Sequence, residues 1–196
     1  MTATVVDSVP LTIRIRDAAL TCIGRFGLGK TTVDDIAREA GCSRATLYRY
    51  YDGKPAIVCA AVAGECERVT TALVDAGRAA PTFADAVVAV ALRGAREVRG
   101  HEALQFLLAH EPEAVLGHLA FAPGDRVLLT VGAAIAPAFD RWLSPDACTR
   151  AGDWVARLVR AYALTPHPPV DLTDAVAARA FLEQLVIPGL AESRTS

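Results

Sequence analysis

The sequence is poor in the residues on which several classes of protein depend. Lysine occurs only at Lys30 and Lys54 in 196 residues, and the formal net charge is −2. This composition excludes a uniformly basic nucleic-acid coat protein. The five cysteines are odd in number and include no CxxC pair, which argues against a disulfide framework and a zinc site. We expect most of them to be small core residues.

Long apolar runs and targeting signals are also missing. The longest uncharged apolar stretch, residues 127–139, is too short to span a bilayer. The first residues lack a basic segment followed by an apolar run, so no signal peptide is indicated and we expect a cytoplasmic protein. With 53% hydrophobic residues, the chain can bury a sizeable core.

The charged residues are unevenly distributed. Residues 1–56 carry 8 Lys and Arg against 6 Asp and Glu, whereas the remainder carries 12 against 16. Both lysines fall in the first segment. This asymmetry is consistent with an N-terminal surface that faces phosphates on an otherwise acidic protein.

The sequence does contain a stretch, residues 31–54, that predicts two short helices around a tight turn. Thr32 suits a helix N-cap, and Asp35 three residues later completes a capping box. The first helix is expected to stop at Gly41, because glycine reaches the left-handed conformation without steric cost. Ser43 can then cap the second helix. The stretch is therefore predicted to be a helix-turn-helix.

In such a unit the second helix lies in the DNA major groove, with its N-terminal residues at the base edges. Arg44 suits a bidentate contact to guanine, Thr46 suits a thymine methyl or a phosphate, and Ala45 permits close approach. A helical hairpin that only packs in a core is the alternative, and the tyrosines among cations argue against it. The expected DNA contacts are Lys30, Thr32, Ser43, Arg44, Ala45, Thr46, Tyr48, Arg49, Tyr50 and Lys54.

These residues resemble the DNA-binding segment of TetR-family transcriptional regulators, over about residues 15–57. The resemblance implies a homodimeric repressor whose C-terminal helical domain binds a small molecule that releases it from DNA. The features that carry it are a preceding helix with Ala18, Ala19 and Phe26, a turn at Gly27, the segment TTVDDIA, the Gly41 turn, Thr46-Leu47-Tyr48, and Lys54 before a fourth helix.

A competing motif overlaps this segment. Residues 24–31, GRFGLGKT, match the phosphate-loop pattern GxxxxGK[ST]. A genuine loop of this kind follows a buried strand and opens a helix, whereas the preceding residues have the period of an amphipathic helix. We therefore expect Lys30 to meet a DNA phosphate. A nucleotide-hydrolysing enzyme is kept as an alternative.

The whole pattern predicts an all-α fold. A first helix over residues 10–26 carries the apolar stripe Ile15, Ala19, Cys22, Ile23 and Phe26, and a long helix begins at Pro55. Another stripe consists of Phe83, Ala86, Val87, Val90, Ala91 and Gly94. The predicted divisions are a flexible arm (1–9), a three-helix helix-turn-helix DNA-binding domain (10–54), a helical domain that the resemblance assigns to ligand binding and dimerisation (55–189), and a flexible tail (190–196).

Residues 127–139 are apolar around the whole helical circumference, which predicts a central buried helix that Pro137 can kink. Small residues such as Gly132 and Ala133 leave room either for close helix packing or for a ligand. The resemblance favours a pocket, and such pockets lie between helices. The effector is expected to be largely apolar. The expected ligand contacts are Phe106, His110, Leu128, Val131, Ile135 and Trp142.

Two helices, over residues 145–163 and 172–187, close the chain. In the family that the chain resembles, the last two helices form a four-helix dimer interface. Core stripes and interface stripes look alike in sequence, so intramolecular core is the alternative. The expected interface residues are Trp154, Leu158, Tyr162, Ala178, Phe181, Leu182 and Leu185.

Catalytic patterns are absent. His101, His110 and His118 lie among several glutamates but form no HExxH pair, and there is no GxSxG. We therefore expect no enzyme activity, cofactor or metal. The prediction is a ligand-responsive, homodimeric repressor with two recognition helices in successive major grooves of a palindromic operator. A helical interaction module without DNA binding is the remaining alternative.

Overall fold

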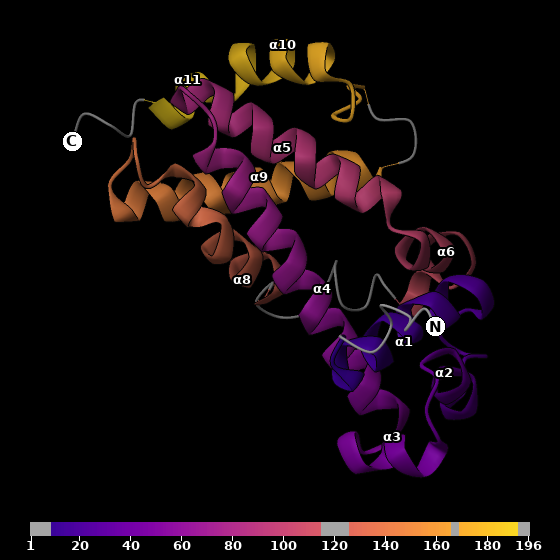
Figure 1. Cartoon of the computed structure of the whole chain (residues 1–196). Helices are drawn as coiled ribbons and strands as arrows, with labels where there is room; N and C mark the ends of the chain where they lie inside the picture. Colours follow the sequence, from indigo (N-terminus) through magenta and orange to yellow (C-terminus); the bar gives the residue numbers. More distant parts are fainter. Residues whose placement is uncertain (1–8, 115–125, 166–168, 192–196) are drawn as a thin grey trace, which may run out of the picture. The chain divides into compact units, whose positions relative to one another are not determined.

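The computed structural model describes residues 9–114, 126–165 and 169–191, with side chains at all of these except 126–129 and 191. Every regular element within them is a helix (Figure 1), which confirms the all-α prediction. None of the described helices has the length and apolar character that a membrane crossing needs. The elements are α1 (Leu11–Phe26), α2 (Val33–Glu39), α3 (Arg44–Tyr50), α4 (Gly53–Arg78), α5 (Phe83–Gly100), α6 (Glu102–His110), α8 (Arg126–Ile135), the 3-10 turn η2 (Ala136–Phe139), α9 (Pro145–Leu164), α10 (Ala175–Leu185) and α11 (Ile187–Ala191).

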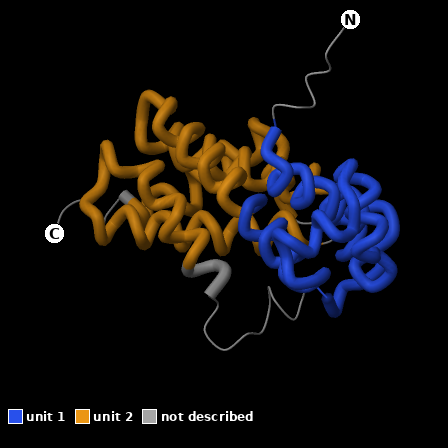
Figure 2. The backbone as a smooth tube through the Cα atoms, turned by 60° about the horizontal axis from the view of Figure 1, so that its bottom comes forward, with its two compact units in different colours: residues 1–65, 102–115 blue, residues 66–101, 116–196 orange. Residues whose placement is uncertain are grey.

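The chain forms two compact units, coloured separately in Figure 2. One comprises residues 1–65 with 102–115, and the other comprises 66–101 with 116–196. We call their described parts the head unit and the body unit. The division therefore falls within α4 rather than just before it, and it assigns α6 to the head unit.

The core of the head unit is built from α1, α2, α3 and the first turns of α4. Ile15, Ile36, Leu47 and Ile57, one from each helix, have no exposed surface. The predicted stripe on α1 is buried from Ile15 to Ile23, but the assignment of Phe26 to it is wrong, since this side chain is 47% exposed. The reason is that α1 ends there: Gly27 takes a φ of 85°, and the stripe ends with the helix.

The core of the body unit surrounds one face of α5. The predicted stripe on this helix, from Phe83 to Gly94, is buried. It joins Val155 of α9 and Leu182 of α10 in one apolar cluster. There the rings of Phe83 and Phe139 pack edge to face, with 6.1 Å between their centroids.

The predicted buried helix over residues 127–139 is partly wrong. The α-helix ends at Ile135 and continues as a 3-10 turn containing Pro137, and Ala133 and Ala134 are exposed. Its small residues serve close packing at one point. A Cβ on Gly152 of α9 would lie 2.2 Å from the Gly132 carbonyl oxygen, so α8 and α9 cross with their backbones in contact.

Other helix ends differ from the prediction by a few residues. Helix α4 begins at Gly53 rather than Pro55. Helix α10 begins at Ala175 rather than near Leu172, because the Asp174 carboxylate accepts hydrogen bonds from the amides of Val176 and Ala177, at 2.8 and 2.9 Å. Such an N-cap sets where a helix starts.

The α8–α9 crossing leads to a stability prediction. Gly152→Ala should lower the free energy of unfolding by about 1–3 kcal/mol, because two packed backbones must separate. Gly100→Ala is the matched control, since a Cβ there meets nothing within 4 Å. Urea unfolding followed by circular dichroism measures both variants. Equal stability of the two would contradict the close crossing.

Candidate nucleic-acid interface

The turn between α2 and α3 is closed by backbone hydrogen bonds. The Cys42 amide donates to the Ala37 carbonyl at 2.9 Å, and the Gly41 amide donates to the Arg38 carbonyl at 3.2 Å. Gly41 has a φ of 64°, a value that glycine adopts without strain. These are the two bonds of a Schellman motif, which ends a helix and sets the direction of the chain after it. The predicted turn at Gly41 is confirmed.

Arg14 holds the same turn from α1. One guanidinium nitrogen, Nη2, donates to the Ala40 carbonyl oxygen at 2.6 Å. It satisfies a carbonyl that the end of α2 leaves without a helical partner. The sequence reasoning missed this residue, because nothing local in the sequence connects Arg14 with a turn 26 positions later.

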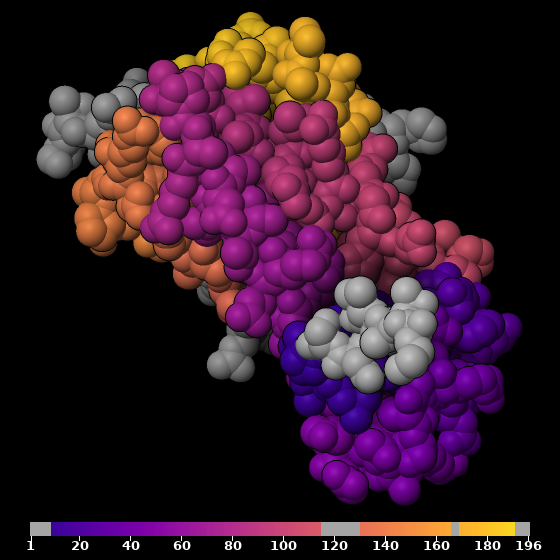
Figure 3. Space-filling model, viewed as in Figure 1, coloured from indigo at the N-terminus to yellow at the C-terminus, as the bar shows by residue number. Residues whose placement is uncertain are grey.

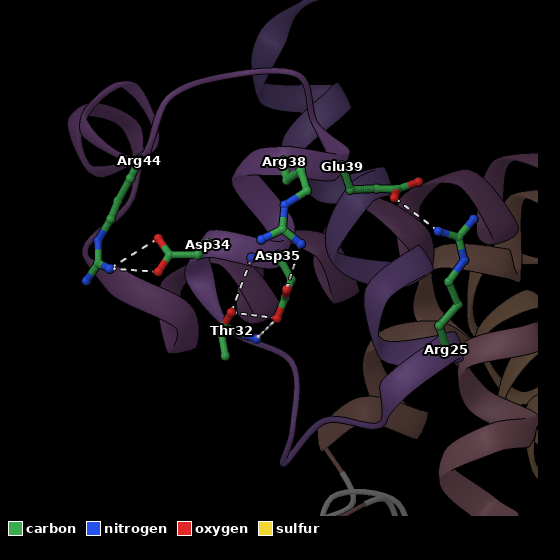
Figure 4. Close-up of polar contacts among 7 residues, drawn as sticks. All are labelled: Arg25, Thr32, Asp34, Asp35, Arg38, Glu39 and Arg44. Carbon is green, nitrogen blue, oxygen red and sulfur yellow. Dashed lines mark hydrogen bonds and ion pairs between the residues drawn. The ribbon is translucent and has the colours of Figure 1, made fainter.

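The first turn of α2 has the predicted capping box (Figure 4). The Asp35 amide donates to the Thr32 hydroxyl at 3.2 Å, and the Thr32 amide donates to the Asp35 carboxylate at 3.1 Å. Hydrogen bonds from the Thr32 hydroxyl and amide lower the pKa of Asp35. Thr32 was predicted to contact DNA, and its hydroxyl is engaged here with Asp35 at 2.5 Å.

The N-terminus of α3 is capped by Ser43, as predicted. The Thr46 amide donates to the Ser43 hydroxyl at 3.0 Å, and the two hydroxyls lie 2.8 Å apart. Leu47 anchors the inner face of the helix. The outer face is open, and the violet atoms of α2 and α3 lie at the surface in Figure 3. The exposed residues of α3 are Arg44, Ala45, Tyr48, Arg49 and Tyr50.

Arg44 is held from two sides. Its Nη1 donates to both oxygens of Asp34, at 2.9 and 3.1 Å (Figure 4). Its guanidinium carbon lies 5.5 Å from the centroid of the Tyr48 ring, within cation–π range. Tyr48, and then Asp34, raise the pKa of the Arg44 guanidinium. The side chain of Arg44 is nevertheless 59% exposed, so it remains accessible to a ligand.

The two lysines differ in their surroundings. Lys30 is exposed in the loop before α2. Lys54, on the first turn of α4, donates from Nζ to the carbonyl oxygens of Leu28 and Gly29 at 2.5 and 3.3 Å. Lys54 therefore holds the loop between α1 and α2, a role that its predicted phosphate contact did not include.

The segment GRFGLGKT does not have the surroundings of a phosphate loop. Helix α1, and not a strand, precedes it. Its Gly29 amide donates to the Glu111 carboxylate at 3.1 Å, and a Cβ on Gly27 would lie 2.1 Å from the same carboxylate. A carboxylate therefore stands where this loop would cradle an anion. This contradicts the nucleotide-hydrolysing alternative.

The residues predicted to line a ligand pocket fall in both units. Phe106 and His110 belong to α6 of the head unit, where their rings stack with centroids 4.4 Å apart. In the body unit, Ile135 is buried in the core, and Val131 and Trp142 pack partly buried against it. The side chain of Leu128 lies outside the described residues.

The predicted dimer residues separate into exposed and buried groups. Trp154 on α9 and Leu185 on α10 are 58% and 66% exposed. Ala178 and Leu182 have no exposed surface within the single chain, so they have none left to bury against a second copy. Ala178 and Leu182 were predicted to lie at a dimer interface, and the structure places them in the core of the single chain instead. The other three, Leu158, Tyr162 and Phe181, are partly buried against the body unit's clusters.

The remaining polar groups form no metal site in the described part of the chain. No group of three or more His, Cys, Asp or Glu side chains there is arranged to hold an ion, and His118 lies outside the described residues. Burial raises the pKa of the Cys22 and Cys148 thiols. A raised pKa disfavours the reactive thiolate.

The family model described as "Bacterial regulatory proteins, tetR family" matches residues 15–61, from the core of α1 to the first part of α4. Over these residues the chain belongs to the TetR family. It is therefore a DNA-binding transcriptional regulator, in agreement with the sequence prediction.

Similar proteins extend the likeness beyond the head. An uncharacterized HTH-type transcriptional regulator of Mycobacterium tuberculosis is 29% identical over 178 residues, which cover 89% of this chain and 83% of that protein. The TetR-family repressor AlkX from a Dietzia species, implicated in biodegradation of n-alkanes, has a TM-score of 0.70 at 18% identity, over 93% of this chain and 98% of that one. FadR from Bacillus subtilis, solved with stearoyl-CoA, has a TM-score of 0.56 at 17% identity, over 89% and 97%.

Proposed function

We propose that this regulator is a homodimeric, ligand-responsive repressor of a palindromic operator. The observation that carries the proposal is the exposed outer face of α3, on which Arg44, Ala45, Tyr48 and Arg49 lie side by side. Two such helices, about 34–36 Å apart, would enter successive major grooves. Acting on chromosomal DNA, the protein would work in the cytoplasm.

The predicted contacts take distinct roles. Arg44 and Ala45 face the base edges, because the first turn of a recognition helix enters deepest. Lys30, Arg49, Tyr48 and Tyr50 contact the backbone, with Thr32, Ser43 and Thr46 beside them. Lys54 acts mainly by holding the loop that carries Lys30, since its ammonium group is bonded to that loop.

A second copy of the chain would dock on α9 and α10. Trp154 and Leu185 support this, because large exposed apolar side chains are the usual anchors of an interface. Val176 of α10, which is 81% exposed, is a further candidate that the sequence reasoning missed. Leu172 and Ala180, four positions to either side of Val176, form an apolar row with it that could have indicated this residue.

The effector is proposed to be largely apolar. Val131 and Trp142 of the body unit are apolar and not fully buried. FadR from Bacillus subtilis, which is similar in fold, was solved in complex with stearoyl-CoA, a ligand with a long acyl chain. Within the head unit, Glu111 just after α6 bonds the loop before α2.

The DNA-reading role predicts different outcomes for two substitutions. Arg44→Ala should cost about 1–3 kcal/mol on the operator and relax the choice of base at one position of each half-site. Lys30→Ala should weaken all duplexes alike and reduce the slope of log affinity against log salt concentration by about two, because each of the two heads of the dimer then neutralises one phosphate fewer. Fluorescence anisotropy, with an operator selected from random duplexes by the purified protein, measures both. Unchanged operator affinity in both variants would reject the interface.

The dimer proposal predicts that Trp154→Glu is monomeric, because burying an unpaired carboxylate in an apolar interface is unfavourable. Val62→Glu is the matched control: this valine is also exposed, at 52%, but it belongs to α4 within the head unit. Sedimentation velocity reports the oligomeric state, and circular dichroism checks that helix content is kept. A Trp154→Glu protein that stays dimeric would refute this interface.

The effector proposal is tested with saturated fatty acids of increasing length. Each added methylene should strengthen binding roughly fourfold, because burial contributes about 0.8 kcal/mol per CH₂, and the melting temperature should rise with it. The bound acid should also lower operator affinity. Val131→Glu should abolish the length dependence. A melting temperature that does not change with chain length would contradict an apolar site.

A further inference from the structure

The carboxylate of Asp34 lies on the surface that is proposed to meet DNA, where a negative charge is unfavourable. Its ion pair with Arg44 offers a physical explanation for a carboxylate at this position. Both partners are more than half exposed, at 54% and 59% of their side chains. Exposed pairs of this kind add little to stability, so stabilisation of the fold is a poor explanation for the contact.

The geometry of the pair leaves Arg44 able to read a base. Both carboxylate oxygens of Asp34 are bonded to one nitrogen, Nη1. The guanidinium has five N–H donors, and Asp34 uses only those on Nη1; Tyr48 lies beside the same group and also raises the pKa of Arg44 by a side-chain hydrogen bond. A bidentate contact to guanine requires two donors. Asp34 can therefore stay bonded to Arg44 while Arg44 is bonded to a base.

Asp34 also has a fixed position from which to hold Arg44. It lies in the first turn of α2, which the Thr32–Asp35 capping box closes. The Schellman turn at Gly41 sets α2 against α3, and the Tyr48 ring limits the guanidinium from another side. A long, flexible arginine side chain is thereby ordered before DNA arrives, so that less conformational entropy is lost on binding.

We propose that Asp34 is a specificity-determining positioning residue, which orients Arg44 toward one base and keeps its guanidinium from pairing with a phosphate instead. The two effects act together. Orientation strengthens the correct contact, and the ion pair withholds the guanidinium from the phosphates that every duplex offers, so that both widen the gap between operator and other DNA. This inference rests on the proposed reading of bases by Arg44.

The test compares Asp34→Ala with Glu39→Ala in the full-length protein. Glu39 is a matched control: it lies on the same helix, has the same charge and is paired with an arginine, Arg25 of α1, at 3.1 Å (Figure 4). Fluorescence anisotropy at fixed salt measures affinity for the selected operator, for the operator changed at the base pair that Arg44 reads, and for an unrelated duplex. Thermal melting checks that both variants remain folded.

Asp34→Ala should bind the unrelated duplex more tightly and should lower the ratio of operator to unrelated affinity by roughly tenfold, within the discrimination that a good bidentate contact provides. Most of that loss should fall at the base pair read by Arg44. Asp34→Glu, which keeps the charge on a longer side chain, should restore part of the ratio. Glu39→Ala should change all three affinities by the same factor.

The double variant separates this inference from the proposed function. In an Arg44→Ala background, Asp34→Ala should no longer alter the preference at that base pair, because the residue through which it acts is gone. If Arg44→Ala lowers the ratio but Asp34→Ala changes all duplexes alike, as Glu39→Ala does, the positioning role is overturned and base reading by Arg44 stands. If Arg44→Ala itself leaves the ratio unchanged, base reading by Arg44 and the positioning role are both rejected.

Discussion

The end of α2 is the constraint on which the DNA-reading surface depends. Two backbone hydrogen bonds close the Gly41 turn, and Arg14 bonds the Ala40 carbonyl from a third helix. Together they set the angle at which the chain enters α3. Leu47 is fully buried in the head core, and with this inner face anchored α3 presents Arg44, Ala45 and Tyr48 outward. The outward face of α3 is thus a consequence of how α2 stops.

Several polar side chains of the head have a structural task on the same surface that is proposed to meet DNA. The Thr32 and Ser43 hydroxyls cap α2 and α3, and Lys54 bonds the carbonyls of the preceding loop. Charged and polar groups that are already hydrogen-bonded lose less freedom when a phosphate arrives. On this surface, the atoms that stabilise the helix ends are among those that we propose to contact DNA. A substitution at a cap therefore changes both, whereas exposed Lys30 and Arg49 can be changed with smaller effects on the fold.

Local features of this fold could be predicted from the sequence, and long-range contacts could not. Caps and turns depend on residues within five positions of one another, so Thr32, Gly41 and Ser43 were assigned correctly. The partners of Arg14, Lys54 and Glu111 are 25 to 82 positions away, and no periodicity indicates them. An apolar stripe in the sequence also does not show which helix, or which chain, packs against it. For that reason Phe26 was placed in the core although it is exposed, and Ala178 and Leu182 were placed at an interface although they are buried.

The loop between α1 and α2 has two anchors on different helices. Lys54 holds its carbonyls from α4, and Glu111, just after α6, holds its Gly29 amide. Gly27 can have no side chain there, because the Glu111 carboxylate occupies the space a Cβ would need. The loop leads directly to Thr32, where α2 begins. A shift of α6 within the head unit would therefore act on the start of α2 through one carboxylate and one amide, with no other helix needed between them.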